Sequence, residues 1–293
     1  MQLQTQFAPG KINLYLKITG HRADGYHLVD TLLLPLDLSD RVEISVEPSN
    51  RPTVICRCPS HPELSGSQNL AAKAAEKYLH ALDLAAEINI CIHKSLWVAA
   101  GLGGGSSNAA SVLSALNNHF CRLSPKELFG MAVEIGADVP FFLDPKPVRA
   151  QGIGEQLTPI HGLATIPLVL VNPGHPLSTA DVYVQFDKMA QQTSPRPSRI
   201  IDKLEFSVSS LTEILDLVHN DLEPPATLLL PEIQELKSVL HTEGALAVGM
   251  TGSGPTMFGI FPNADCAFQA TNNILKLQRF LVASTQSTNG LAP

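Results

Sequence analysis

The sequence predicts an α+β fold in two lobes, with helices covering the faces of mostly antiparallel sheets. Residues 7–19 alternate well enough between apolar and polar side chains to form a strand, and residues 28–38 and 41–47 continue the β pattern. Asp24-Gly25 is a strong turn signal between strands. Residues 70–82 and 106–120 instead carry apolar side chains at helical spacing. Segments of both periods in one chain indicate sheets packed against helices.

The remaining elements follow from the same signals. Ser124 and Glu127 have the spacing of a capping box, with Pro125 at the first helical position. The strands are expected at 7–19, 28–38, 41–47, 87–93, 166–171, 245–250 and 257–261. The helices are expected at 70–82, 106–120, 125–135, from about 180, at 211–217 with 220–223 continuing the helical run, and at 231–244. A polar, insertion-like loop is expected at 190–200.

Composition limits the kinds of protein that this chain can be. With 293 residues, 44% of them hydrophobic and 16% charged, it is typical of a soluble globular protein. A net charge of −7 argues against a nucleic-acid partner. No apolar run approaches the length of a membrane helix, and the first residues do not resemble a signal peptide, so a cytoplasmic protein without a membrane partner is expected. The sequence leaves the oligomeric state open.

The five cysteines do not form a disulfide framework. Their number is odd and their spacing is irregular, which favours reduced thiols. Cys56-Arg57-Cys58 could suggest a metal site. No second pair of Cys or His stands at zinc spacing, so we do not expect one there.

A glycine-rich loop at 99–105 leads directly into the helix expected at 106–120. Four of its last five residues are glycine, which lets the backbone approach a ligand closely. Ser106, Ser107 and Asn108 are all suitable N-cap residues, so free N–H groups and the positive end of the helix dipole should face the loop. These features predict an anion site suited to a polyphosphate.

The loop differs from the two common phosphate motifs. It lacks the lysine of G-x-x-x-x-G-K-[ST], and Ser106 replaces the last glycine of G-x-G-x-x-G. The alternative is a flexible glycine hinge. Hinges rarely lead straight into a capped and strongly periodic helix, so phosphate binding is the better interpretation.

Two further positions carry candidate chemistry. Lys11 and Asn13 lie two apart on a predicted strand and share a face, which is either a binding face or a solvated polar one. Asp138 lies between the helix stop at Gly136 and an apolar turn, where a cap or turn residue is the usual interpretation. The residues alone do not decide either case.

The motifs, taken in order, resemble those of the GHMP kinases. They are A-P-G-K-I-N-L-Y-L at 8–16, R-A-D-G-Y-H at 22–27, G-L-G-G-G-S-S-N-A-A at 101–110, G-A-D-V-P-F-F at 136–142, N-D-L-E at 220–223 and T-G-S-G-P-T at 251–256. The resemblance implies a ribosomal-protein-S5-like N-terminal domain over 1–155 with the ATP loop, and a ferredoxin-like C-terminal domain over 156–293. It is nearest to the branch that phosphorylates the 2-hydroxyl of 4-diphosphocytidyl-2-C-methyl-D-erythritol, a step of isoprenoid precursor synthesis without mevalonate.

The resemblance also implies roles for individual residues, with ATP and Mg²⁺ as cofactors. The catalytic residues would be Lys11 and Asp138. The ATP-binding residues would be Asn69, Leu70, Lys94, Ala99, Ala100, Gly101, Leu102, Gly103, Gly104, Gly105, Ser106, Ser107 and Asn108. The residues that bind the cytidyl substrate would be Asn13, Tyr26, His27, Thr179 and Tyr183. The Mg²⁺ ligands are not identified, since a cap role explains Ser107 as well as a metal contact does.

Two departures and two alternatives stay open. Trp97 replaces a proline that is usual in this branch, and residues 144–150 are less glycine-rich than in the family, so Lys146 and Arg149 are left as surface charges. Another acceptor, such as homoserine or mevalonate, is a competing interpretation, against which Tyr26-His27 argues. A catalytically silent nucleotide-binding module is another, and the presence of both Lys11 and Asp138 disfavours it.

Overall fold

The computed structural model describes residues 2–190 and 211–290, which form two compact units. Unit 1 comprises residues 1–10, 38–97 and 103–145, and unit 2 comprises 11–37, 98–102 and 146–293. Both units are discontinuous because β1 (Gln2–His21) and β2 (His27–Pro48) each pass from one into the other. The domain boundary near residue 155 stays a prediction.

The sheet of unit 1 is built on the second half of β2. Residues Arg41–Pro48 pair antiparallel with β4 (Ala86–His93), and β3 (Thr53–Arg57) pairs parallel with β4. Side chains of β4 alternate between buried and partly exposed, as its isoleucines predict. The two strands expected at 28–38 and 41–47 are one continuous strand, β2.

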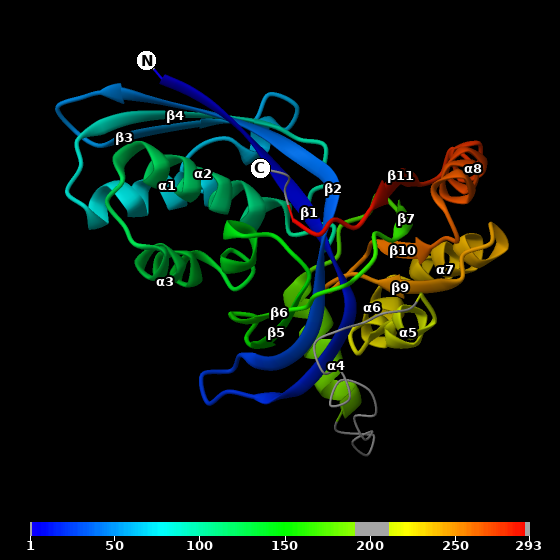
Figure 1. Cartoon of the computed structure of the whole chain (residues 1–293). Coiled ribbons are helices and arrows are strands. Elements are labelled where there is room, and N and C mark those ends of the chain that lie inside the picture. The colour runs from blue at the N-terminus through cyan, green and yellow to red at the C-terminus, as the bar shows by residue number, and fades with distance from the viewer. Residues whose placement is uncertain (1, 191–210, 291–293) are drawn as a thin grey trace. The chain divides into compact units, whose positions relative to one another are not determined.

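In unit 1, one helix packs on this sheet, a second packs against the first, and a third packs on these two helices (Figure 1). They are α1 (Leu70–Ala81), α2 (Gly104–Phe120) and α3 (Pro125–Ile135), with short 3₁₀ turns η1 (Pro62–Leu64) and η2 (Pro140–Leu143). α1 packs against α2, and the buried face of α2 is rich in Ala, Val and Leu. The predicted capping box of α3 is confirmed, with Ser124 and Glu127 each bonded to the other's backbone N–H.

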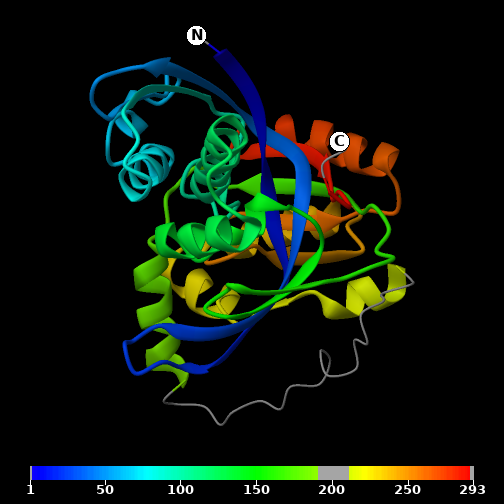
Figure 2. The same cartoon turned by 60° about the vertical axis from the view of Figure 1, so that its left-hand side comes forward.

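Unit 2 contains a four-stranded antiparallel sheet in the order β11-β7-β10-β9. Its strands are β7 (Pro167–Asn172), β9 (Ala247–Met250), β10 (Met257–Ile260) and β11 (Leu281–Gln286). Its helices are α4 (Thr179–Ala190), α5 (Leu211–Leu217), α6 (Glu223–Leu229), α7 (Glu232–Thr242) and α8 (Ala264–Leu275). α8 packs against β7 and β11 (Figure 2), while α7 packs against β9 and β10.

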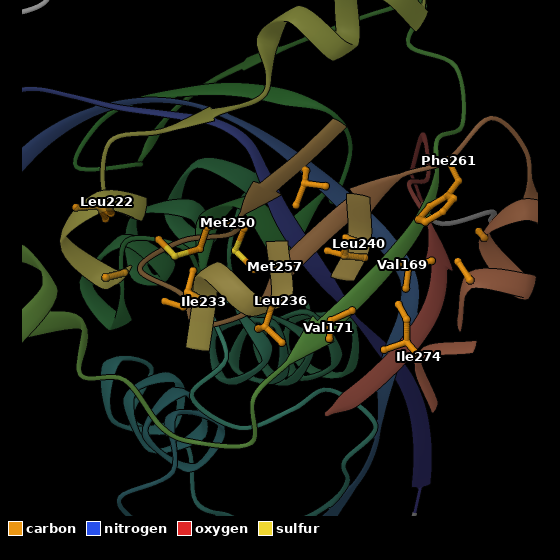
Figure 3. Close-up of a cluster of buried hydrophobic side chains, with 14 of the residues drawn as sticks. Val169, Val171, Leu222, Ile233, Leu236, Leu240, Met250, Met257, Phe261 and Ile274 are labelled. Carbon is orange, nitrogen blue, oxygen red and sulfur yellow. The ribbon is translucent and has the colours of Figure 1, made fainter. Parts of the chain in front are cut away.

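The core of unit 2 forms where α7 and α8 cover one face of this sheet. Leu236 and Leu240 of α7 and Ile274 of α8 meet Val169 and Val171 of β7 (Figure 3). All five side chains are almost fully buried. Burying each of them contributes about 1.5–3 kcal/mol to the free energy of folding. The same core includes Met250 at the end of β9 and Met257 at the start of β10, which flank the glycine turn between these strands.

A second set of strands in unit 2 surrounds the first half of β2. Residues Val29–Leu33 pair antiparallel with β5 (Val148–Gly152), which pairs with β6 (Gln156–Pro159). β8 (His219–Asn220) runs parallel to β1 at Tyr15 and Leu16. The helical interpretation of 220–223 is therefore wrong at its first residues, and the loop expected at 190–200 lies almost wholly outside the described residues.

Candidate functional site

The phosphate-binding candidate is the loop that ends at Gly103. Gly103 has φ 71° and ψ 14°, a left-handed conformation that few other residues adopt, and it is the N-cap of α2. The helix begins at Gly104, so the expected caps Ser106, Ser107 and Asn108 instead lie inside the first turns, which corrects that prediction. No side chain caps this end of α2, which leaves backbone N–H groups for an anion.

Gly101 shows why the loop needs glycine. A Cβ added at Gly101 would lie 2.3 Å from the carbonyl oxygen of Thr251, at a backbone φ of +75°. The Thr251 hydroxyl also donates to the Gly101 carbonyl at 3.2 Å. In unit 2, the glycine turn at 251–256 thus packs directly on the loop at 98–102.

Lys11 and Asn13 belong to the same network. Both side chains are only 4% exposed, which excludes the solvated polar face. Lys11 Nζ donates to Asn13 Oδ1 at 2.6 Å, and the Gly252 N–H donates to the same oxygen at 2.9 Å. The Asn13 amide donates to Thr31 Oγ1 at 2.9 Å. Asn13 is therefore held in one orientation, and it holds the Lys11 ammonium beside the glycine turn.

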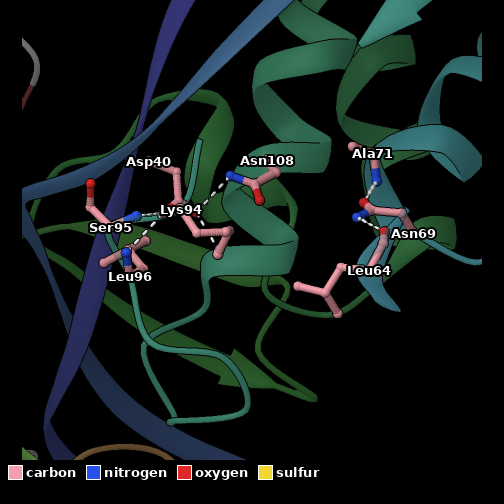
Figure 4. Close-up of polar contacts among 8 residues, drawn as sticks. All are labelled: Asp40, Leu64, Asn69, Ala71, Lys94, Ser95, Leu96 and Asn108. Atoms are coloured by element: carbon pink, nitrogen blue, oxygen red, sulfur yellow. Dashed lines mark hydrogen bonds and ion pairs between the residues drawn. The ribbon is translucent and has the colours of Figure 1, made fainter. Parts of the chain in front are cut away.

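Lys94 is anchored by Asp40, a residue that the sequence analysis missed. The two form an ion pair in which the Asp40 side chain is fully buried (Figure 4). Asp40 also accepts from the N–H groups of Ser95 and Leu96, both at 2.8 Å, and from the Asn108 amide at 3.0 Å. This carboxylate ties β2 to the segment after β4 and to α2. Nothing in the local pattern around Asp40 marks it, because its partners lie 54 to 68 residues away.

Asn69, one of the residues expected to bind ATP, is the N-cap of α1. Its Oδ1 accepts from the Ala71 N–H at 2.9 Å, and its Nδ2 donates to the Leu64 carbonyl at 2.8 Å (Figure 4). Leu70 is the first residue of the helix. The start of α1 is thus rigidly positioned, and its role toward a nucleotide stays a prediction.

Asp138 lies in unit 1 between the end of α3 at Gly136 and the 3₁₀ turn η2. Its side chain is partly buried. The neighbouring Val139, Pro140 and Phe141 are buried, so the backbone that presents the carboxylate is fixed by packing. An orienting or proton-accepting role needs such a fixed position.

The residues expected to bind the cytidyl group all belong to unit 2, with Asn13 on β1, Tyr26 just before β2, His27 at the start of β2, and Thr179 and Tyr183 on α4. The rings of His27 and Tyr183 pack with centroids 4.5 Å apart, and His27 Nε2 lies 2.8 Å from Asp187 Oδ1. Tyr26 is 59% exposed, with the Arg22 guanidinium 5.7 Å from its ring centroid. Thr179 shares a 2.8 Å hydrogen bond with Ser253 of the glycine turn, Oγ1 to Oγ.

Arg149 is not a free surface charge. It forms a two-pronged ion pair with Asp30, Nε to Oδ1 at 2.8 Å and the terminal nitrogen to Oδ2 at 2.6 Å. The pair crosses the β2–β5 ladder, so strand pairing brings together residues that the sequence separates by 119 positions. The sequence analysis gives Arg149 no role, and the structure shows that it pairs with Asp30 across two strands.

Ser107 has a buried hydroxyl group whose chemistry fits the Mg²⁺ that the family resemblance implies. Among the described residues, its Oγ is one of two buried side-chain polar atoms without a hydrogen-bond partner, the other being Thr271 Oγ1. An uncoordinated hydroxyl oxygen in the first turn of α2 suits a hard cation such as Mg²⁺. The cap role that competed with this interpretation is excluded, since Gly103 is the N-cap.

Comparison with known proteins identifies relatives for both halves of the chain. Residues 69–144 match the GHMP kinases N terminal domain, and residues 202–276 match the GHMP kinases C terminal domain. The chain is 42% identical over 280 residues to a 4-diphosphocytidyl-2-C-methyl-D-erythritol kinase of Anaeromyxobacter sp. (strain Fw109-5), covering 94% of this chain and 87% of the relative. It is 40% identical to the kinase of that name from Citrifermentans bemidjiense, covering 96% and 97%. A crystal structure of a 4-(cytidine 5'-diphospho)-2C-methyl-D-erythritol kinase, 33% identical, matches with a TM-score of 0.76 over 97% of this chain and 100% of that one.

Proposed function

The chain belongs to the GHMP kinase family, and within it to the 4-diphosphocytidyl-2-C-methyl-D-erythritol kinases, and on this premise we propose that it transfers the γ-phosphoryl group of ATP to the 2-hydroxyl of 4-diphosphocytidyl-2-C-methyl-D-erythritol. The observation that carries the proposal is identity of about 40% to these kinases over more than nine tenths of the chain. The uncapped N-terminus of α2 supports it, since a polyphosphate needs such donors.

In the proposed reaction, the chain positions two substrates and stabilises charge. Backbone N–H groups at the start of α2 hold the phosphates of ATP, and Lys11 stabilises the charge that develops on the transferred group. Asp138 accepts or orients the proton of the acceptor hydroxyl. Mg²⁺ would neutralise phosphate charge, and Ser107 is the residue that would help to hold it.

The acceptor would be selected by its cytosine ring. Tyr26, His27 and Tyr183 supply aromatic faces, and His27 also supplies a donor or acceptor for a base edge. Lys94 and Asn69 would lie beside the nucleotide. Asp40 holds Lys94 in place, and the hydrogen bond from the Ala71 N–H holds Asn69 in place.

None of the helices in the described part combines the length and the hydropathy that crossing a bilayer requires.

The test is phosphoryl transfer from ATP to a panel of three acceptors: the cytidyl methylerythritol, homoserine and mevalonate. We expect turnover with the first and none above background with the others. Activity confined to homoserine or mevalonate would assign the chain to another acceptor. ATP binding without any turnover would indicate a silent nucleotide-binding module.

A further inference from the structure

Two histidines that flank the turn between β1 and β2 lie close to one carboxylate. His21 ends β1, His27 begins β2, and Asp187 comes from α4. Nε2 of His27 lies 2.8 Å from Asp187 Oδ1, and Nε2 of His21 lies 3.5 Å from the same oxygen. The two imidazole rings pack with their centroids 4.2 Å apart. Three elements thus direct three potential ligand atoms to one point.

These separations suit a tetrahedral transition-metal ion. Bonds of about 2.0–2.2 Å to nitrogen and oxygen place neighbouring ligand atoms about 3.3–3.6 Å apart in a tetrahedron. The ligand atoms of the three side chains all lie within 4.8 Å of one another. The His21–Asp187 separation of 3.5 Å already fits, and a small outward movement of partly exposed Asp187 from His27 would bring the set to coordination geometry, with water in the fourth position.

The local charges also favour a cation. Asp187 is the carboxylate that both imidazoles face, and imidazole with carboxylate is a common ligand set for zinc. The nearby cation Arg22 is paired with Asp24 at 2.5 Å, so its charge is largely balanced.

A second cluster in unit 1 is less suitable. Glu43, Cys91 and His93 also lie close together, but Arg41 is paired with Glu43, and burial raises the pKa of the Cys91 thiol. The thiol is the wrong protonation state for a metal ligand at neutral pH. This cluster serves below as the competing site.

We propose that His21, His27 and Asp187 form a binding site for a divalent transition-metal ion, Zn²⁺ being the best match. The bound ion fastens the hairpin ends to α4. Where the proposed function holds, the ion also competes with the cytidyl acceptor, because it occupies the His27 nitrogen next to Tyr183. The site itself does not depend on that function.

The test is a titration of the full chain with Co²⁺, followed by visible absorption, and with Zn²⁺, followed by calorimetry. We expect one ion per chain with the d–d bands of a nitrogen and oxygen site and without a thiolate charge-transfer band. His21→Asn should lower the affinity for Co²⁺ at least tenfold. Asp187→Asn, which keeps the shape of the side chain and removes its charge, should lower it by as much. The unliganded fold should be unaffected, since the His21 side chain is 51% exposed.

The matched control is His219→Asn. His219 is similarly exposed, at 47%, and lies 2.8 Å from a single carboxylate, Asp221, so its loss should leave Co²⁺ affinity unchanged. Equal Co²⁺ affinity in wild type, His21→Asn and Asp187→Asn would overturn the site. A thiolate charge-transfer band that disappears in Cys91→Ser would overturn it too, by placing the ion at the competing cluster. His21→Asn should keep wild-type kinase turnover with Mg²⁺ alone, so failure of the acceptor panel and failure of the metal site are separate results.

Discussion

At the level of single residues, the structure separates side chains that hold the site from those proposed to react. Asp40 and Asn13 are buried and make three or more hydrogen bonds each, so they fix the positions of Lys94 and Lys11. Asp138 instead lies partly exposed on a short turn. Substitutions at the two kinds of position should therefore have different signatures.

Asp138→Asn should retain the fold and ATP affinity while kcat falls by roughly 10²- to 10⁴-fold, because the amide has the same shape but accepts no proton. Stopped assays for kcat and calorimetry with an ATP analogue measure the two quantities. Near-normal kcat in Asp138→Asn would remove Asp138 from the catalytic step.

Lys94→Met should lower the free energy of unfolding by roughly 3–5 kcal/mol, because it leaves the buried Asp40 carboxylate without its cation. The double variant Asp40→Asn with Lys94→Met should be less destabilised than Lys94→Met alone. Urea unfolding monitored by circular dichroism checks this. Strictly additive losses would mean that the pair is not coupled.

Tyr183→Ala and Tyr26→Ala should each lower the affinity for the cytidyl substrate about tenfold or more, since stacking on an aromatic face contributes roughly 1–3 kcal/mol to the binding of a base. ATP affinity should be nearly unchanged in both. Calorimetric titration of each variant with each ligand measures this, and unchanged affinity for the cytidyl substrate in both variants would refute the stacking interpretation.

At the level of secondary-structure elements, the main feature is the junction between the glycine loop and α2. The helix begins at a left-handed glycine without a side-chain cap, and the loop before it packs on the glycine turn between β9 and β10. The Asn220 amide braces that turn by donating to the carbonyls of Met250 and Gly252 at 2.7 and 2.9 Å. Glycines in this junction should consequently differ in their tolerance of a side chain.

Gly101→Ala should destabilise the protein by more than about 2 kcal/mol and lower its affinity for ATP, because the added Cβ would clash with the Thr251 carbonyl at a strained φ. The matched control is Gly105→Ala. Its Cβ would make an ordinary 3.5 Å contact with Leu70 and gain helix propensity, so stability should hold or rise slightly. Thermal unfolding and ATP titration compare the two, and equal effects would show that the close approach at Gly101 does not matter.

At the level of the whole molecule, the residues proposed for the reaction come from both units. Asp138 belongs to unit 1 and Lys11 to unit 2, while the glycine loop contributes to each. The five cysteines are free, so no disulfide joins the units, as the odd count predicted. The stability of the folded chain therefore depends on non-covalent packing. The reactivity of the thiols measures how well each cysteine is buried by that packing.

Alkylation by iodoacetamide at pH 8 should modify the exposed Cys121 and spare Cys56 in the folded chain. Burial raises the pKa of the Cys56 thiol to about 11, so only about one molecule in a thousand carries the thiolate at that pH. In denaturant both should react at similar rates. Peptide mass spectrometry of the folded and unfolded protein measures this, and rapid labelling of folded Cys56 would contradict the burial.

Sequence alone determined what depends on local periodicity and on the order of motifs. The helices at α1, α2 and α3, the capping box at Ser124 and the family all follow from neighbouring residues, because helix hydrogen bonds and caps connect positions three or four apart. Only the tertiary structure decided the partners of buried charges. Lys94 meets Asp40 across 54 positions, and Arg149 meets Asp30 across 119. Such pairs form because strand pairing and helix packing bring distant residues into a low-dielectric interior, where a charge without a partner is costly.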